Sequence, residues 1–390
     1  MILVVLSFIT FAVSPLLSLP ITLWGVLYDK KYKPYFGLVL ALFVGYFLYH
    51  VEPDITKDLY RYISTMEEFL SYSFSTTIKD IWNNSDPLSY TIMYLVSLIF
   101  SPKYIVFIAP IICYPIYLWI ISDYAKRESI NNTTEKFVVI SFLVIFAIAT
   151  TFLGIRYGIA VAVFILALYQ DSVHKRPFVG IVLYIISTLL HSSMALVAIL
   201  RALLFVLKNI PWLWYTLVVL SATSVLLMQS LAKNLSSVPF LSTFSDRADV
   251  YTQPYTPIGM VYYLSIGISV IATVLLILFR KYGKDENKLS TIFHLNLTVF
   301  VIGLVNIQNY YLASRYFTIG KILFCITIIP ILSGIAKIED SVKRKTVAYA
   351  LWSAVIILMV LSAPLQMNGI LDYHYNGLSK SLLINELLIH

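Results

Sequence analysis

Long hydrophobic runs without charge alternate with short charged segments along this chain. Nine runs stand out, and most reach or approach the roughly 20 residues that a helix needs to cross a membrane. They are residues 2–28, 35–51, 104–122, 137–155, 177–200, 209–232, 254–279, 289–314 and 346–371. Backbone polar groups in lipid must bond within their own segment, so such runs predict helices. The runs are continuous rather than alternating, unlike the strands of a β-barrel.

Composition supports a membrane protein and removes one competing class. Hydrophobic residues make up 59% of the 390 residues and charged residues only 12%, whereas a soluble domain carries about 25% charged residues. The net charge of +8 arises because Lys and Arg gather between the hydrophobic runs, as in cytoplasmic loops of membrane proteins. We therefore expect no nucleic-acid partner. The sequence predicts an all-α, polytopic transmembrane helical bundle of about 11–13 spans, forming a single integral membrane domain over residues 1–390.

Short basic segments define the predicted cytoplasmic side of the membrane. They begin near Lys30, Lys175, Arg280 and Lys337. Threading the hydrophobic runs between these segments predicts outer loops near residues 52–86 and 233–256. The first run, residues 2–28, is expected to be one membrane span, because it lacks the basic start and the cleavage site of a signal peptide.

The threading contains one conflict, between residues 52 and 171. Continuing the threading from the outer loop through residues 88–100, 104–121, 137–153 and 157–170 places Lys175 and Arg176 on the outer side, against the positive-inside rule. One crossing is therefore miscounted. Either residues 88–121 form a re-entrant pair, or the outer loop contains a helix that dips into the membrane.

Several motifs of soluble and metal-dependent chemistry are missing from the sequence. It has no G-x-x-x-x-G-K phosphate loop, no G-x-G-x-x-G, no H-E-x-x-H, no C-x-x-C and no G-x-S-x-G. The sequence therefore supports neither ATP-driven transport nor zinc proteolysis, and we expect neither a metal nor a cofactor. Cys113 and Cys325 lie inside hydrophobic runs and are expected to be packing residues.

Two ionisable residues near the predicted outer ends of spans are the first site candidates, because charge within a membrane is costly. Arg156 opens a helix with small residues, in Gly154-Ile-Arg-Tyr-Gly158. The competing interpretation is an arginine that extends to the membrane interface. His191 precedes two serines and can act as an acid or a base near neutral pH. A histidine at a helix end, beside a serine that caps the next helix, is the alternative.

An outer segment at residues 54–62 supplies three more candidates. It contains Asp58, Tyr60 and Arg61. Acidic, basic and tyrosine side chains on one exposed segment suit a ligand rich in hydroxyl groups. A merely solvated loop explains the same pattern.

The last candidates are two arginines that the threading also places on the outer side. Arg247 follows an aspartate, which is the pattern of an ordinary ion pair, and Arg315 has the position of an interfacial anchor. Arg201 and Lys321 lie within predicted spans and are left out of the predicted site. Several arginines around one cavity would bind an anion, and guanidinium groups suit phosphate oxygens. An anion joined to a sugar and approached from lipid describes a polyprenyl-pyrophosphate-linked glycan.

Four short motifs occur in order along the chain. They are the acidic and aromatic segment 54–62, Gly-Ile-Arg-Tyr-Gly-Ile-Ala at 154–160, His-Ser-Ser at 191–193 and Ser-Arg-Tyr at 314–316. In these motifs, and in its length and number of spans, the chain resembles the EpsG branch of the Wzy-type polysaccharide repeat-unit polymerases.

The resemblance implies glycosyl transfer between two lipid-linked substrates at the outer face of a bacterial plasma membrane. A growing chain on undecaprenyl pyrophosphate would pass through its anomeric carbon to a hydroxyl of the incoming unit. Arg156 and Arg315 would stabilise the leaving pyrophosphate, and His191 or Asp58 would take the proton. The other substrate-binding candidates are Tyr60, Arg61 and Arg247.

Two other functions remain open at this point. A flippase for the same lipid-linked sugar would also need a cationic cavity, but the low glycine count (14 of 390) and the one-sided candidate charges favour the polymerase. A ligase that joins finished glycan to another acceptor would use the same donor. A polymerase would act beside a flippase and a chain-length regulator.

Overall fold

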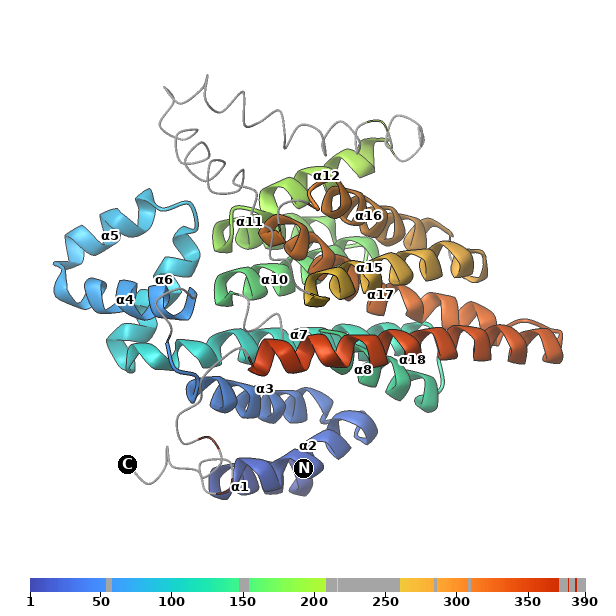
Figure 1. The fold of residues 1–390 in the computed structure, drawn as a ribbon, viewed down its shortest axis with the longest axis horizontal. Helices are drawn as coiled ribbons and strands as arrows, with labels where there is room; N and C mark the ends of the chain where they lie inside the picture. The colour runs from blue at the N-terminus through green and yellow to red at the C-terminus, as the bar shows by residue number, and fades with distance from the viewer. Residues whose placement is uncertain are drawn as a thin grey trace. The chain divides into compact units, whose positions relative to one another are not determined.

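The computed structural model describes residues 1–53, 58–146, 154–207, 216, 260–283, 286–307, 310–371, 378 and 383. Within these ranges the chain is almost entirely helical and contains no β-strand (Figure 1). It divides into two compact units. Unit 1 comprises residues 1–143, 147–195 and 366–390, and unit 2 comprises residues 144–146 and 196–365.

Five helices in the described ranges are long and apolar enough to cross a membrane. They are Pro102–Arg127, Ile155–Ser172, Tyr262–Tyr282, Ala313–Ala336 and Ser341–Pro364. Seven shorter apolar helices accompany them. Helices satisfy their own backbone hydrogen bonds, as lipid requires. The predicted all-α, multi-pass membrane architecture is confirmed.

Four helices form the centre of unit 1. They are α3 (Lys33–Tyr49), α7 (Ile108–Arg127), α10 (Ile155–Ser172) and α11 (Pro177–Leu190). α7 and α10 run parallel, as two hydrogen bonds show. Near the starts of these helices the Cys113 thiol donates to the Gly158 carbonyl at 3.4 Å. Near their ends the Tyr169 hydroxyl donates to the Asp123 carboxylate at 2.6 Å.

α3 and α11 run antiparallel to that pair. Gly45, near the end of α3, lies against Phe107 just before α7, where an added β-carbon would be 2.4 Å from the ring. Ser187, near the end of α11, donates to the Ala160 carbonyl near the start of α10 at 2.7 Å. Unit 1 therefore has an Arg156 end, where α3 and α11 finish and α7 and α10 begin. We call the opposite end the basic end.

The basic end carries cationic residues, of which the sequence assigns Lys33 and Lys175 to the cytoplasmic side. Lys33 forms a buried ion pair with Glu135 of α8 (Asn132–Phe146). Arg127 finishes α7, and Lys175 lies in the turn between α10 and α11. Positive charge thus gathers at one end of the unit, as the positive-inside rule expects.

The first hydrophobic run forms two helices, and the expectation of one span over residues 2–28 is wrong. α1 (Ile2–Val13) and α2 (Pro15–Tyr28) fold back on each other, with Ser7 and Thr22 hydroxyls 2.7 Å apart. The chain breaks at Ser14, whose backbone is extended, and proline at the first position of α2 favours this break. With 12 and 14 residues, the helices are about 18 and 21 Å long, shorter than the hydrocarbon core of about 30 Å.

The predicted outer loop at residues 52–86 contains two helices, and a third follows it. They are α4 (Asp58–Ser71), α5 (Phe74–Asn83) and α6 (Pro87–Ile99), which group together at the Arg156 end of unit 1 (Figure 1). α6 begins beside Arg156, because the residue before it, Asp86, bonds to that guanidinium group.

Both ends of α6 lie at the Arg156 end. α6 leads into the 3₁₀ helix η1 (Pro102–Phe107), whose Tyr104 and Phe107 rings lie 5.2 and 6.2 Å from the ring of Tyr49, the last residue of α3. With 13 residues, α6 is about 20 Å long and too short for a full crossing. The expected crossing at residues 88–100 is therefore wrong. Removing it brings the Lys175 segment to the same side as the other basic segments.

Unit 2 is built from helices of the second half of the chain. They are most of α12 (Met194–Leu207), α15 (Met260–Phe279), α16 (Glu286–Val305), α17 (Tyr310–Ala336) and most of α18 (Ser341–Leu371). The Asn296 amide donates to the Gly320 carbonyl at 2.9 Å and ties α16 to α17. The Tyr262 hydroxyl of α15 donates to the Ile307 carbonyl beyond α16. The predicted outer loop at 233–256 lies outside the described residues.

Candidate functional site

A buried ion pair lies at the Arg156 end of unit 1. The Arg156 guanidinium donates from Nη1 to Asp86 Oδ2 at 3.0 Å, and the two side chains are only 20% and 1% exposed. Arg156 stands in the first turn of α10, which begins directly after Gly154. Gly154 has φ +150°, a conformation that glycine adopts without the steric cost of a β-carbon. This glycine lets the chain enter α10 with Arg156 turned into the unit.

Two tyrosine rings flank the Arg156 guanidinium. Its central carbon lies 5.2 Å from the ring centroid of Tyr62 on α4 and 5.2 Å from that of Tyr90 on α6. Aromatic faces attract a cation at this distance, and more strongly where water is scarce. Within the described part of the chain, Arg156 Nε is buried and has no hydrogen-bond partner. The tyrosines and Asp86 therefore hold the charge in place while leaving part of its donor capacity unused.

Asp86 joins three segments of unit 1 through its two carboxylate oxygens. Oδ2 accepts from Arg156 on α10, and Oδ1 accepts from the backbone N–H of Ser192, after α11, at 2.8 Å. Close by, the Ser89 hydroxyl of α6 donates to the Leu190 carbonyl at 2.6 Å. Sequence reasoning missed Asp86 because it counted the residue as part of a solvated loop. Its position directly before a proline that starts a helix was the one available signal.

His191 follows the last residue of α11 and is buried. Its Nδ1 accepts from the backbone N–H of Ser193 at 3.2 Å and lies 2.9 Å from the Ser193 hydroxyl. Since a backbone N–H can only donate, Nδ1 must carry a lone pair, and the neutral ring then holds its proton on Nε2. The ring of Tyr157 meets that of His191 edge-on, with centroids 5.5 Å apart. The neutral imidazole thus carries its proton on Nε2.

Asp58 supplies a more exposed carboxylate beside the same helix start. It is the first residue of α4, and its side chain is 41% exposed. A β-carbon added to Gly154 would lie 3.6 Å from both Asp58 Oδ2 and the Tyr62 hydroxyl. Arg61 Nη1 lies 3.6 Å from Asp58 Oδ1 in an exposed pair, a type of contact that contributes little stability. The carboxylate therefore remains open to a ligand.

The structure brings together the three predicted catalytic residues, Asp58, Arg156 and His191, at one end of unit 1. Tyr60 and Arg61 are exposed on α4 of the same unit. Arg315 belongs to unit 2, where it is half-buried in the second turn of α17. Arg247 lies outside the described residues.

A comparison with protein families bears on the whole molecule. Residues 30–375 match the model of the EpsG family. The chain belongs to the EpsG family. The match covers most of both units and confirms the resemblance seen in the short motifs. Neither curated proteins nor solved structures gave a match.

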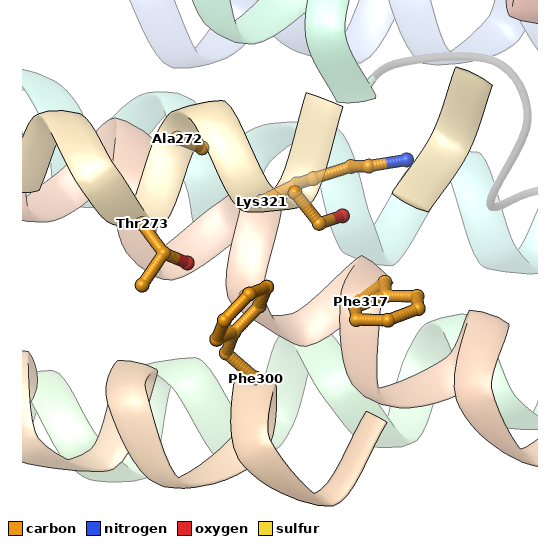
Figure 2. Close-up of a pocket in the computed structure, with 7 residues that line it drawn as sticks. Ala272, Thr273, Phe300, Phe317 and Lys321 are labelled. Atoms are coloured by element: carbon orange, nitrogen blue, oxygen red, sulfur yellow. The ribbon is translucent and has the colours of Figure 1, made fainter. Parts of the chain in front are cut away.

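Unit 2 of this EpsG-family protein contains a small cavity between α15, α16 and α17. Ala272 and Thr273 of α15, Phe300 of α16 and Phe317 of α17 line it together with Lys321 (Figure 2). Figure 2 shows the amine end of Lys321 pointing away from Ala272 and Thr273. That amine donates to the hydroxyl of Ser265 on α15 at 2.9 Å. The cavity has room for about one water molecule, which is too little for a sugar or a phosphate.

No metal site is evident in the described residues of this EpsG-family chain, since they contain no group of three or more His, Cys, Asp or Glu side chains able to hold an ion. The Arg156 end gathers a guanidinium, an imidazole, a carboxylate and tyrosine rings.

Proposed function

We propose that this EpsG-family protein is a membrane glycosyltransferase that polymerises polyprenyl-pyrophosphate-linked oligosaccharide repeat units into a surface polysaccharide. The observation that carries the proposal is the buried Arg156–Asp86 pair, with His191 and Asp58 gathered around the same helix start. A fixed cation, a hydrogen-bond donor and an open carboxylate are the groups that displacement of a pyrophosphate by a hydroxyl requires.

The placement of these groups supports a reaction at the outer face of a bacterial plasma membrane. The basic segments of unit 1 lie at the end opposite Arg156. Basic loops remain on the cytoplasmic side of multi-pass proteins, so the Arg156 end faces outward. Lipid-linked sugar units would approach it from the outer leaflet, delivered by a flippase, and a chain-length regulator would act on the product.

The donor pyrophosphate is assigned to Arg156 and His191. Asp86 accepts one of the five N–H groups of the guanidinium, and other donors can bind phosphate oxygens at the exposed part of the side chain. His191 adds its Nε2 proton. Such donors stabilise the negative charge that develops as the bond from the anomeric carbon to the pyrophosphate oxygen breaks. Tyr62 and Tyr90 keep the guanidinium in place during this step.

The acceptor proton is assigned to Asp58. As the acceptor hydroxyl oxygen bonds to the anomeric carbon, its proton passes to the Asp58 carboxylate. His191 suits this role less well, because Ser193 occupies the lone pair on Nδ1 and Nε2 already carries a proton. Tyr60 and Arg61, exposed on the same helix as Asp58, are the groups we assign to the sugar of the acceptor.

The test is reconstitution of the purified protein in vesicles with one lipid-linked repeat unit, followed by a gel that resolves chain length. We expect a ladder that Arg156→Ala abolishes. Arg127→Ala, which removes an exposed ion-paired arginine at the basic end, is the matched control and should leave the ladder intact. Substrate that moves between leaflets without a ladder would instead identify a flippase. Transfer of preformed glycan to a different acceptor would identify a ligase.

A further inference from the structure

α4 and α5 expose large apolar side chains although they are not membrane-crossing helices. Phe74 and Trp82 of α5 are 69% and 71% exposed. Leu70 of α4 and Tyr72, between the two helices, are also exposed. With 14 and 10 residues, the helices are about 21 and 15 Å long, too short to cross the hydrocarbon core. An aqueous loop would have no reason to present these groups to water.

The two helices are amphipathic, because each buries one face against the unit and exposes another that carries charged and apolar side chains. α4 buries Tyr62, Met66 and Phe69 against the unit, whereas Glu67 and Glu68 are exposed. The same division holds on α5. It buries Thr77 and Ile81 and places the exposed Lys79 three residues before Trp82, so that a cation and an indole ring lie on the same face of the helix. Aromatic rings beside cations are typical of helices that lie at a membrane surface.

The exposed face continues onto α6. The Phe74 ring lies 6.4 Å from the ring of Tyr94 on α6. Beyond that tyrosine the last turn of α6 and the residue after it also expose large apolar side chains. They are Leu95, Leu98, Ile99 and Phe100. Exposed apolar side chains therefore run from α5 along the part of α6 that leads to α7, a helix long and apolar enough to cross a membrane.

We propose that α4, α5 and the end of α6 form a platform that lies in the headgroup–acyl boundary of the leaflet at the Arg156 end. Phe74 and Trp82 are embedded in lipid, and Glu67 and Glu68 face water. The partner of this surface is the membrane itself. The apolar end of α6 belongs to the surface and leads to α7, which is long and apolar enough to cross a membrane, and the exposed Glu67 and Glu68 of α4 border the surface.

The platform has one consequence for the site, and this consequence alone rests on the proposed function. Asp58 and Tyr62 both lie on α4, so one side of the Arg156 site is built from the platform. Its depth in the leaflet is then the depth at which a lipid-linked pyrophosphate lies. The membrane placement itself stands or falls independently of any enzymatic activity.

Single spin labels on the full-length protein test the placement. The native cysteines, Cys113 and Cys325, are buried, so a label attaches selectively to Phe74→Cys or Trp82→Cys. In vesicles of phosphatidylethanolamine and phosphatidylglycerol, we expect molecular oxygen to relax both labels more than a water-soluble nickel chelate does. Glu68→Cys, exposed on the charged side of α4, is the matched control and should show the reverse.

Two results would overturn the proposal. Labels at positions 74 and 82 that respond like the label at position 68 would mean that the platform stands in water. Labels that neither reagent reaches would mean that protein covers the surface. A second measurement needs no cysteine: brominated lipids should quench the part of the fluorescence that disappears in Trp82→Phe. Quenching of that part by aqueous iodide, and not by brominated lipids, would equally sink the idea. Neither measurement depends on polymerase activity.

Discussion

The two ends of unit 1 each hold an arginine bonded to an aspartate, and the pairs differ in almost everything else. At the basic end Arg127 Nε donates to Asp123 Oδ2 at 2.7 Å, one turn away on the same helix, with side chains 45% and 24% exposed. At the other end Arg156 donates to Asp86 at 3.0 Å, across 70 positions of sequence, with far less exposure. The shorter bond is not the more consequential one, because water can replace an exposed partner but not a buried one.

The surroundings of the two aspartates widen this contrast. Asp123 accepts from three side chains, since the Tyr169 hydroxyl and His174 Nε2 join Arg127 at 2.6 and 2.9 Å. Asp86 accepts from the Arg156 side chain and from the backbone N–H of Ser192, directly after His191. Loss of one donor at Asp123 therefore leaves two others. Loss of Asp86 leaves the buried Arg156 without its carboxylate and also releases the turn that positions the His191 imidazole. Only at this end, therefore, does one carboxylate hold both a charged side chain and a backbone turn.

The largest effect in this comparison is expected from Asp86→Ala. It leaves the Arg156 charge buried without its carboxylate, which typically costs about 3–5 kcal/mol. Because Arg156 reaches solvent in part, we expect the lower end of that range. The free energy of unfolding can be measured by denaturant titration in detergent micelles. The double variant Asp86→Ala, Arg156→Ala should lose less than the sum of the two single variants. Strict additivity would contradict a coupled pair.

Asp58→Asn should separate chemistry from stability at the same end. The amide cannot accept the acceptor proton, so turnover of lipid-linked repeat units should fall by about 10²-fold or more. The free energy of unfolding should stay unchanged, because the side chain is 41% exposed and its ion pair is weak. The readouts are the rate of ladder formation and a denaturant titration of the same preparation. Full activity would remove Asp58 from the reaction.

Gly154→Ala tests whether the backbone conformation at position 154, just before α10, requires glycine. At φ +150° an alanine is strained, which costs about 1–3 kcal/mol. Gly267→Ala is the matched control, since nothing lies within 4 Å of an added β-carbon there and alanine favours a helix. Thermal unfolding should show a loss at 154 and no loss at 267. Equal effects would mean that the strain is relieved by a local shift.

The smallest effect is expected from Arg127→Ala. Exposed ion pairs between residues four apart on one helix contribute about 0.3–0.5 kcal/mol, and Asp123 keeps two other donors. The free energy of unfolding should therefore change by less than the error of most denaturant titrations, and the rate of ladder formation should not change. A loss comparable to that of Asp86→Ala would show that the two ends are equivalent after all.

Much of this architecture was readable from local sequence. The uncharged runs predicted helices and the membrane as solvent, because the cost of exposing backbone to lipid acts segment by segment. Arg156 and His191 drew attention because each is an ionisable group in an apolar context. The conflict over Lys175 even located the faulty crossing between residues 52 and 171. Its cause, a short α6 with both ends on one side, was not readable.

What only the tertiary structure decided is which distant residues meet. Hydropathy is the same for a run that spans the membrane and for one that folds back, so the sequence predicted one span over α1 and α2. The contact between Ser7 and Thr22 shows instead that the two helices fold back on each other. Asp86 read as a loop residue because its partners come from α10 and from the turn after α11. The sequence by itself determined the helices and the membrane, since these follow from local hydrophobicity. Helix packing alone brought a guanidinium, an imidazole and two carboxylates to one end, since those contacts join segments far apart in the chain.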